Sequence, residues 1–473
     1  MTPSSQKEDQ GFDLAVIGAG SAGFSASITA AETGANVALI GHGLIGGTCV
    51  NVGCVPSKAL IRVAESLHVA KASRRFDGIS AQAQLDDWAA VRTQKDALVN
   101  ELRQAKYEDL LPQYDNVSYR PGRASFGADG GLVVDGTPLR ADKIIIATGS
   151  HVFVPPINGI RDTPWLDSTA VFALQELPAS MIILGGGFIG CEMAQMLSRF
   201  GVAVTIACRS RLLPFGEPEI SAALQKIFED EGIKVECALS YEGVRRAAEG
   251  VVLSFKRGGE THTLKAQSLA LATGRSPNSH DMGLDAAGIK CSPGGAIEID
   301  QYMQTSRPGV YAAGDVTGRD QFVYMAAYGA KLAAKNAFGR QDVYDNAAMP
   351  EVTFTDPQIA SVGHTEASAE AAGLQTKTSL LPLSAVPRAL AARDTRGLIK
   401  LIANAADDKL VGAHIMAAEG GDSIQSAALA IKAGMTTTEL GATLFPYLTT
   451  VEGLKLAAQV FDKDISKLSC CAG

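Results

Sequence analysis

The stretch Phe12-Asp13-Leu14-Ala15-Val16-Ile17-Gly18-Ala19-Gly20-Ser21-Ala22-Gly23 decides the fold. Its first half is predominantly apolar, which predicts a buried strand, and three glycines follow at the spacing of a dinucleotide-binding turn. A helix is expected from about Ala22 to Thr33. Glycine permits the tight turn, the approach of a pyrophosphate to the backbone and close helix packing, so the stretch favours a dinucleotide site over a structural turn.

The next strand departs from the usual dinucleotide pattern. Val37-Ala38-Leu39-Ile40 predicts a second strand, which in this kind of unit commonly ends in an acidic residue that binds the ribose hydroxyls. Gly41 and His42 stand there instead. We therefore expect other groups to anchor the adenosine.

Two cysteines follow in Gly46-Gly47-Thr48-Cys49-Val50-Asn51-Val52-Gly53-Cys54-Val55-Pro56-Ser57-Lys58. They lie at the opening of a predicted helix that runs toward Glu65, where the helix dipole favours a thiolate. The pattern indicates a redox-active pair. Two packed small residues are the plain alternative, and a zinc site is disfavoured because no second pair of cysteines or histidines lies at ligand spacing.

The same strand-turn-helix pattern then begins again. Ser180-Met181-Ile182-Ile183-Leu184 predicts a strand, and Gly185-Gly186-Gly187-Phe188-Ile189-Gly190 a second dinucleotide turn. The following strand, 204–207, leads to Arg209, where NAD-binding proteins keep an acid. An arginine can pair with a 2′-phosphate, which favours NADPH over NADH, the alternative being a solvated side chain.

Matching Ala-Thr-Gly strand ends, at 147–149 and 272–274, follow the two units. Two dinucleotide units in one chain indicate two nucleotide cofactors, commonly a flavin and a nicotinamide. From about Ala348 the character changes to two strand-like segments, 352–354 and 398–402, and two helix candidates, 423–433 and 451–461. This last part predicts a dimerisation domain.

Composition sets the broad class. The 473 residues fit about three domains, and 46% hydrophobic residues with 49 glycines describe a globular protein. A net charge of −8 argues against nucleic acid as a partner.

Residues 1–10 predict a disordered leader rather than a signal peptide, and the glycines within 14–31 argue against a membrane span. A cytoplasmic protein without stable membrane association is expected, with its eight cysteines as thiols, redox centres or metal ligands.

Taken together, the cysteine motif and Gly314-Asp315 resemble those of the flavin disulfide reductases, the group of lipoamide dehydrogenase and glutathione reductase. The resemblance covers essentially the whole chain. It implies an α/β fold with two Rossmann-like domains and a C-terminal α+β dimerisation domain. FAD would bind to residues 11–152 and 275–345, NADPH to the inserted residues 153–274, and residues 346–473 would build the interface of a homodimer.

Within that group, the C-terminal segment is most similar to the mercuric reductases. The similarity lies in Leu444-Phe445-Pro446-Tyr447-Leu448-Thr449-Thr450-Val451-Glu452 and in the end Leu468-Ser469-Cys470-Cys471-Ala472-Gly473. Disulfide reductases carry an acid-base histidine where Tyr447 stands, and this chain keeps Glu452 of that motif. Some mercuric reductases begin with a small metal-binding domain, which is not expected here because the first cysteine is Cys49.

The resemblance also implies roles for single residues. Cys470 and Cys471 of one subunit would deliver Hg(II) to Cys49 and Cys54 of the partner subunit, with Tyr107 and Tyr447 lining the transfer site. Cys54 would be the charge-transfer thiolate beside the flavin and Cys49 the exchange thiol. Lys58 and Glu192 match an ion pair at the flavin, although Tyr107 taken alone could be packing.

The residues expected to contact the cofactors follow from the same comparison. Those expected at FAD are Gly18, Gly20, Ser21, Ala22, Gly23, Gly47, Thr48, Lys58, Ala147, Thr148, Gly149 and Asp315. Those expected at NADPH are Gly185, Gly187, Ile189, Gly190, Glu192, Arg209 and Gly274. The mercury ligands would be Cys49, Cys54, Cys470 and Cys471.

The implied activity is NADPH-dependent reduction of Hg(II), arriving as a thiol complex, to Hg(0) for mercury detoxification. NADPH would first open a disulfide between Cys49 and Cys54. The alternatives are an NADPH-dependent reductase of a small disulfide or lipoyl substrate and a redox-sensing or mercury-sequestering flavoprotein without turnover. The other four cysteines, at 191, 208, 237 and 291, have no partners at ligand spacing in the sequence and are expected to be packed thiols.

Overall fold

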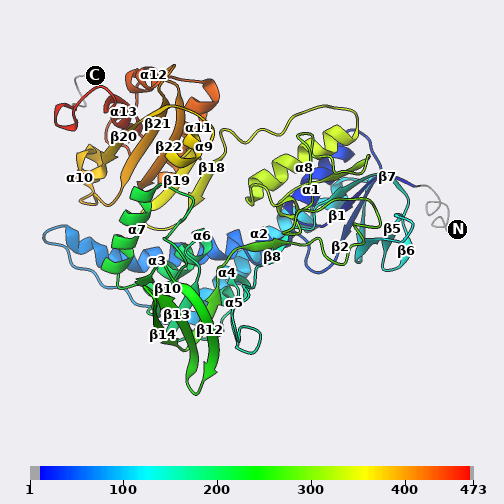
Figure 1. Ribbon diagram of the computed structural model, residues 1–473, viewed down its shortest axis with the longest axis horizontal. Helices are drawn as coiled ribbons and strands as arrows, with labels where there is room; N and C mark the ends of the chain where they lie inside the picture. Colours follow the sequence, from blue (N-terminus) through cyan, green and yellow to red (C-terminus); the bar gives the residue numbers. More distant parts are fainter. Residues whose placement is uncertain (1–10, 469–473) are drawn as a thin grey trace. The chain divides into compact units, whose positions relative to one another are not determined.

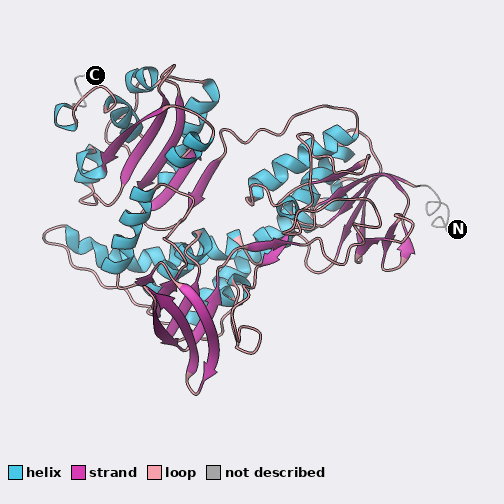
Figure 2. Cartoon of the chain, viewed as in Figure 1, coloured by secondary structure: helices cyan, strands magenta, loops and turns pink. Residues whose placement is uncertain are grey.

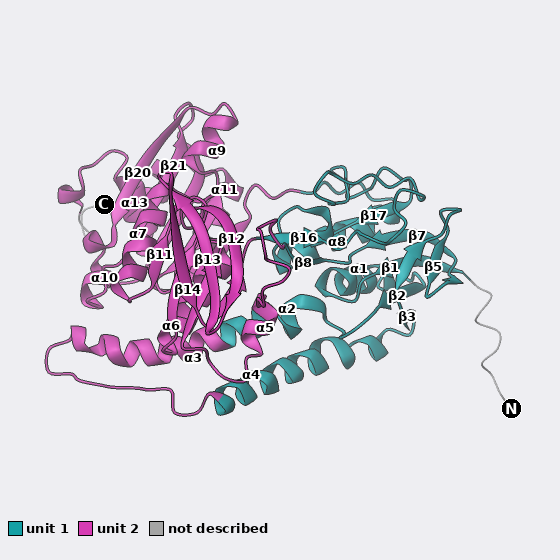
Figure 3. Ribbon diagram, turned by 60° about the horizontal axis from the view of Figure 1, so that its bottom comes forward, with its two compact units in different colours: residues 1–59, 89–153, 274–344 teal, residues 60–88, 154–273, 345–473 magenta. Residues whose placement is uncertain are grey.

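The structure, a computed structural model, describes residues 11–468. The chain forms two compact units (Figure 3). The first takes the described residues up to 59 with 89–153 and 274–344, and the second takes 60–88, 154–273 and the described residues from 345 onward. No helix between residues 11 and 468 is long and apolar enough to cross a membrane.

The first unit is built on a parallel sheet of five strands in the order β17-β7-β1-β2-β3. These are β1 (Phe12–Ile17), β2 (Val37–Gly41), β3 (Val117–Pro121), β7 (Ala141–Ile146) and β17 (Val310–Ala312). The strands β7, β1 and β2 are labelled in Figure 1. β1 has the predicted bounds. The all-parallel order follows from strands that are apolar on both faces and therefore need cover on each side.

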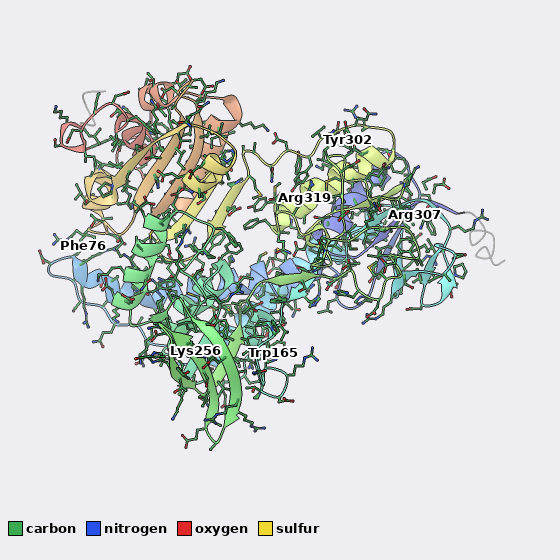
Figure 4. The ribbon with its side chains drawn as sticks, viewed as in Figure 1. Phe76, Trp165, Lys256, Tyr302, Arg307 and Arg319 are labelled. Atoms are coloured by element: carbon green, nitrogen blue, oxygen red, sulfur yellow. The ribbon has the colours of Figure 1, made fainter. Side chains whose placement is uncertain are left out.

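The two faces of this sheet are covered differently. Leu14 and Val16 point to the helices α1 (Ser21–Ala31) and α8 (Val323–Ala337), which pack on each other. Ala15 and Ile17 point to the opposite face, which is covered by a small antiparallel sheet and the segment 282–297. The small sheet comprises β4 (Ala124–Phe126), β5 (Leu132–Val134) and β6 (Thr137–Pro138). Arg307, labelled in Figure 4, stacks over the ring of Phe126 at 5.6 Å and extends that cover.

The helices after β2 carry the cysteine motif. They are α2 (Gly47–Asn51) and α3 (Cys54–Ala72). Helix α4 spans Trp88–Arg103, and Gln104–Glu108 form a π-helical turn directly after it. The strands β8 (Ser150–Val152) and β16 (Arg275–Pro277) pair in antiparallel fashion within the first unit.

The second unit contains another parallel sheet, in the order β11-β10-β9-β15. Its strands are β9 (Ser180–Leu184), β10 (Ala203–Ala207), β11 (Lys234–Glu236) and β15 (Ser268–Leu271), with helices α5 (Ser168–Phe172), α6 (Phe188–Arg199) and α7 (Pro218–Asp230). An antiparallel sheet adds β12 (Ser240–Ala247), β13 (Gly250–Arg257) and β14 (Glu260–Ala266). Lys256 on β13, labelled in Figure 4, forms an ion pair with Glu242 on β12 at 2.9 Å.

The C-terminal part of the second unit is an antiparallel sheet with helices, drawn in magenta and cyan in Figure 2. The strand order is β18-β19-β22-β21-β20, for β18 (Pro350–Thr353), β19 (Gln358–Gly363), β20 (Thr376–Pro382), β21 (Leu398–Asn404) and β22 (Leu410–Ala417). The helices are α9 (Glu366–Ala371), α10 (Pro387–Ala391), α11 (Gly420–Ala433), α12 (Thr437–Ala442) and α13 (Glu452–Gln459). The predicted α/β class, with two parallel nucleotide-type sheets and a C-terminal α+β part, is confirmed.

Candidate active site

The first glycine turn, between β1 and α1, has the geometry that a dinucleotide phosphate requires. A Cβ atom at Gly18 would lie 2.2 Å from the carbonyl oxygen of Ala147, and one at Gly23 would lie 1.7 Å from the carbonyl oxygen of Gly18. Only glycine fits these positions. Helix α1 begins after Gly20 with no side chain capping its amides, so Ser21 and Ala22 lie at an N-terminus suited to an anion.

The cysteine motif is fastened directly to this turn. The amide of Gly46 donates a hydrogen bond to the carbonyl oxygen of Ala19 at 2.8 Å. A Cβ at Gly47 would lie only 2.6 Å from the Cα of Gly20. The phosphate turn and the start of α2, including Thr48, therefore share one packed backbone, which fits the turn and the motif contacting the same cofactor.

The missing acid at Gly41 has a steric explanation. Gly41 is buried at the end of β2, and a Cβ there would lie 2.6 Å from the Cβ of Ala19 and 3.2 Å from the hydroxyl oxygen of Tyr119. The Tyr119 hydroxyl also donates to the Gly41 carbonyl at 3.4 Å. The backbone here is packed too closely to carry any side chain, so the acid of the usual fingerprint has no room.

The same edge of the sheet places Asp315, which follows β17, beside the segment after β7. The Asp315 carboxylate accepts a hydrogen bond from Ser150 Oγ at 2.6 Å, and Arg275 Nε lies 3.7 Å from it. Thr148 Oγ1 donates to the carbonyl oxygen of Asn278 at 2.7 Å. Ala147, Thr148, Gly149 and Asp315 are thus held at the carboxyl edge of the parallel sheet, where nucleotide ligands bind in this fold class.

Cys49 lies in α2 and Cys54 is the first residue of α3, and both side chains are half-buried thiols. The pKa of Cys49 is raised, first by its hydrogen bond with Cys54 and then by burial, while the charge of Lys58 acts in the opposite direction. The two sulfurs therefore titrate as a coupled pair. Cys54 lies at a helix N-terminus, one turn before the Lys58 ammonium, and this position favours a thiolate.

Tyr107 lies next to the sulfur pair. Its ring packs edge-on against Phe24 at 4.7 Å, and a Cβ at Gly46 would lie 3.2 Å from the Tyr107 ring. Its hydroxyl hydrogen-bonds Ser21 Oγ at 3.2 Å. The pKa of Tyr107 is raised, first by burial and also by the charges of the Cys49 and Cys54 sulfurs, whereas the Ser21 hydrogen bond lowers it. The π-helical turn Gln104–Glu108 thus brings a phenol to the pair.

Asn51 and Arg103 hold the cysteine loop, and the sequence did not reveal them. Asn51 Nδ2 donates to the carbonyl oxygens of Ile45 and Gly47 at 2.8 and 2.9 Å. Arg103 Nη1 donates in turn to Asn51 Oδ1 at 3.1 Å. The position of Asn51 two residues after Cys49 was the one indication in the sequence. It could not predict the hydrogen bond to Arg103, which lies 52 residues away.

The second glycine turn, between β9 and α6, repeats the first. A Cβ at Gly185 would lie 2.2 Å from the carbonyl oxygen of Ala272. A Cβ at Gly190 would lie 2.2 Å from the carbonyl oxygen of Gly185. Gly187 has open space instead, and α6 starts after it with no side-chain cap. The turn, which includes Ile189, therefore fits a second dinucleotide phosphate.

The remaining predicted NADPH residues lie at several places. Glu192 is buried in α6, and its Oε1 accepts a hydrogen bond from the amide of Phe354 at 2.9 Å. Arg209 is exposed just after β10. Gly274 belongs to the first unit, where its carbonyl accepts from the amide of Phe153 at 2.9 Å. Lys58 and Glu192 fall in different units, so their predicted ion pair stays a prediction.

Near the C-terminus, Glu452 shapes the turn that carries Tyr447. Glu452 is buried, and its Oε2 accepts a hydrogen bond from the amide of Leu448 at 3.1 Å. Tyr447 is 57% exposed and Leu444 91% exposed. The buried acid thus supports an exposed aromatic turn, while the predicted delivery cysteines Cys470 and Cys471 lie outside the described residues.

Residues 12–334 match the family "Pyridine nucleotide-disulphide oxidoreductase", and residues 349–458 match the dimerisation domain of that family. This chain belongs to the pyridine nucleotide-disulphide oxidoreductases. It is 46% identical over 470 residues to a protein of Streptomyces lividans named "Mercuric reductase", covering 98% of this chain and 99% of that one. A Staphylococcus aureus protein of the same name is 42% identical, with 98% and 85% covered.

Solved oxidoreductases of this family have the same fold. The flavoprotein disulfide reductase RclA from Escherichia coli, solved as a Cu(II) complex, matches with a TM-score of 0.83 and 29% identity, covering 96% of this chain and 100% of that one. The predicted resemblance to the flavin disulfide reductases, and to the mercuric reductases among them, is confirmed. Membership implies an enzyme that uses a flavin and a pyridine nucleotide, and the matched dimerisation domain supports the predicted homodimer.

Two of the four cysteines outside the motif lie next to each other, which their spacing in the sequence did not indicate. The sulfur atoms of Cys208 and Cys237 are 3.2 Å apart. They are 29 residues apart in sequence, and the pairing of β10 with β11 brings them together. Cys191 is fully buried in α6, as expected of a packed thiol.

Proposed function

We propose that this oxidoreductase catalyses NADPH + Hg(II) → NADP⁺ + H⁺ + Hg(0). The observation that carries the proposal is the exposed turn in which Tyr447 stands where disulfide reductases carry their acid-base histidine. The last histidine in the sequence is His414, so the C-terminal segment has no imidazole to protonate a leaving thiol. Reduction of a metal ion needs no proton donor at the metal.

The nucleotide sites are assigned from the glycine turns. We propose that FAD binds to residues 11–152 and 275–345, with Gly18, Gly20, Gly47 and Asp315 among its contacts, and that NADPH binds within 153–274 at Gly185, Gly187 and Gly190. The tight contacts of these glycines and the uncapped helices support the assignment. The chemistry that bound FAD would supply is acceptance of a hydride equivalent from NADPH and transfer of the electron pair to sulfur or mercury.

Arg209 supports NADPH over NADH. Its exposed guanidinium follows β10 where an acid would contact the ribose hydroxyls of NADH. The guanidinium of the neighbouring Arg211 binds the backbone of its own loop, because its Nη2 donates to the carbonyl oxygens of Pro214 and Gly216 at 3.0 and 2.7 Å. Arg209 is therefore the arginine of this loop that we assign to the 2′-phosphate.

The sulfur pair is proposed to hold the substrate. Hg(II) is a soft cation that prefers thiolate ligands, and the start of α3 and the Lys58 ammonium favour a thiolate at Cys54. Cys49, whose pKa is raised by Cys54 and by burial, exchanges its proton for the metal in the second step. The Tyr107 phenol closes one side of the pair, with its pKa raised and its proton retained.

Delivery is proposed to come from the tail of the other subunit. Cys470 and Cys471 would take Hg(II) from two small thiols, releasing both thiols, and pass it to Cys49 and Cys54 of the partner subunit. The exposed Leu444 and Tyr447 support a site completed by a second chain, since the dimerisation domain carries them. We place the enzyme in the cytoplasm, where NADPH and reduced thiols are abundant.

The electron balance tests the proposal. Purified flavoprotein is supplied with NADPH, Hg(II) and excess small thiol, and Hg(0) vapour is measured together with NADPH loss. One Hg(0) per NADPH is the expected result. NADPH loss without Hg(0), or a preference for a small disulfide, would identify a disulfide reductase, and mercury uptake without NADPH loss would identify a sequestering protein.

A further inference from the structure

A second pair of cysteines lies in the parallel sheet of the second unit. Ala207 at the end of β10 pairs with Glu236 at the end of β11, so Cys208 and Cys237 are the next residues on adjacent strands. The amide of Cys208 donates to the carbonyl oxygen of Glu236 at 2.9 Å. The amide of Leu239 donates to the carbonyl oxygen of Cys208 at 3.1 Å. Hydrogen bonds on both sides therefore fix the two backbones beside each other.

This placement satisfies what a disulfide requires. Adjacent strands lie about 4.8 Å apart, within the Cα separations that disulfides span. The two sulfurs already lie 3.2 Å apart, so they need to approach by only about 1.2 Å to bond.

The two sulfurs differ in access and charge. Cys208 is buried, whereas Cys237 is half-buried. The pKa of Cys237 is lowered, first by its hydrogen bond from Cys208 and also by the charge of Arg257, whereas burial acts against this. Cys237 is thus the accessible nucleophile and Cys208 the buried sulfur that resolves it.

The pair borders the second dinucleotide turn. A Cβ at Gly186 would lie 3.2 Å from the Cβ of Cys208, and Arg209 is the next residue in the chain. Tyr241 donates to the carbonyl oxygen of Ala207 at 2.7 Å and experiences the charges of Cys208, Arg209 and Cys237. A change in the position of the Cys208 side chain therefore affects both the second glycine turn, at Gly186, and Arg209.

We propose that Cys208 and Cys237 form a redox-sensitive dithiol that closes to a disulfide and weakens NADPH binding. The Cys237 thiolate attacks a low-molecular-weight disulfide RSSR, forming a mixed disulfide and releasing one RS⁻. Cys208 then loses its proton, attacks the Cys237 sulfur and releases the second RS⁻. The net change is two protein thiols and RSSR to one protein disulfide and two RSH. The effect on NADPH rests on the proposed function.

The test uses the whole flavoprotein incubated with oxidised glutathione, acid-quenched, alkylated and digested with trypsin. Cleavage after lysine and arginine places Cys208 in peptide 200–209 and Cys237 in peptide 235–245. We expect one linked peptide that joins these two and disappears after dithiothreitol. Its absence, or a link to peptide 162–199 that contains Cys191, overturns the inference.

The second readout is NADPH binding without added thiol. The NADPH concentration that gives half-maximal flavin reduction should rise about tenfold on oxidation, as expected for a misplaced charge-assisted contact, and return on reduction. Cys208→Ala and Cys237→Ser should each abolish the shift, whereas Cys291→Ser, outside the pair, should keep it. If the linked peptide forms but the NADPH concentration for half-maximal flavin reduction does not change, the disulfide has no effect on NADPH binding, and that part of the proposal is wrong. If the reduced protein does not oxidise NADPH, the proposed function is contradicted. The linked peptide tests disulfide formation in either case.

Discussion

The hydroxyl groups of Tyr107 and Ser21 hydrogen-bond each other at 3.2 Å, although the residues lie 86 positions apart. Ser21 is the first residue of α1, at the phosphate turn, and Tyr107 lies against the segment that leads to Cys49. This bond joins the helix N-terminus to the phenol beside the sulfur pair. The nucleotide turn and the cysteines are therefore parts of one packed site.

Tyr107→Phe should impair mercury turnover while leaving the fold intact. The ring contacts with Phe24 and Gly46 stay, so the free energy of unfolding should fall by only about 1 kcal/mol for the lost hydrogen bond. We expect kcat for thiol-bound Hg(II) to fall by about tenfold and the rate of flavin reduction by NADPH to be unchanged. Tyr114→Phe, outside the site, is the matched control. Equal kcat for both variants would assign Tyr107 to packing.

Gly41→Ala should weaken the flavin site. The added Cβ would lie 2.6 Å from the Cβ of Ala19, directly behind the phosphate turn. Overpacking of this kind costs about 1–3 kcal/mol, and we expect faster loss of flavin on dilution, measured by fluorescence. The control is Gly294→Ala, whose nearest neighbour would be 3.9 Å away. Wild-type flavin retention in Gly41→Ala would refute the steric reason for the missing acid.

Asp394 gives a prediction for acid stability. Burial acts to raise the pKa of Asp394, but the hydrogen bond and charge of Arg396 bring it down to about 2. Because the pKa is lower in the folded state, the stabilisation is present above the ordinary value near 3.8 and is lost as pH falls toward 2. It is on the order of 2 kcal/mol.

Denaturant unfolding of Asp394→Asn checks this. The variant should be less stable than wild type at neutral pH, and the difference should shrink as pH falls through about 4 to 2. Asp407→Asn removes an exposed ion pair with Lys409 and should change stability little at any pH. A constant difference between Asp394→Asn and wild type across that range would contradict the assignment.

Changing Cys470 and Cys471 together to Ala should separate delivery from chemistry. Flavin reduction by NADPH should be unchanged, because it depends on the glycine turns. Turnover of Hg(II) held by bulky or excess thiols should fall, whereas Hg(II) with small ligands should still reach Cys49 and Cys54. Steady-state rates equal to wild type under all thiol conditions would leave the tail no delivery role.

Sequence reasoning predicted the elements whose signal is local. β1 and β9 have the predicted bounds because their apolar runs end at glycine turns. Contacts between distant segments could not be predicted, and these include the Cys208 and Cys237 sulfurs and the hydrogen bond of Arg103 to Asn51.

The reason Gly41 replaces an acid also required the structure. Ala19 and Tyr119 occupy the space of a side chain, and Tyr119 comes from a strand far along the chain. The spacing of Cys49 and Cys54 at a helix start predicts a redox-active pair, and that role stays a prediction. Tyr107 lies next to the two sulfurs, and its predicted role in lining the transfer site stays a prediction as well.

The most direct measurement compares substrates for the same enzyme. NADPH oxidation is followed with Hg(II) in excess small thiol, with oxidised glutathione and with lipoamide, at equal enzyme and NADPH concentrations. The account predicts rapid turnover with Hg(II), one Hg(0) formed per NADPH, and little activity with either disulfide. Equal or faster turnover with oxidised glutathione would contradict it.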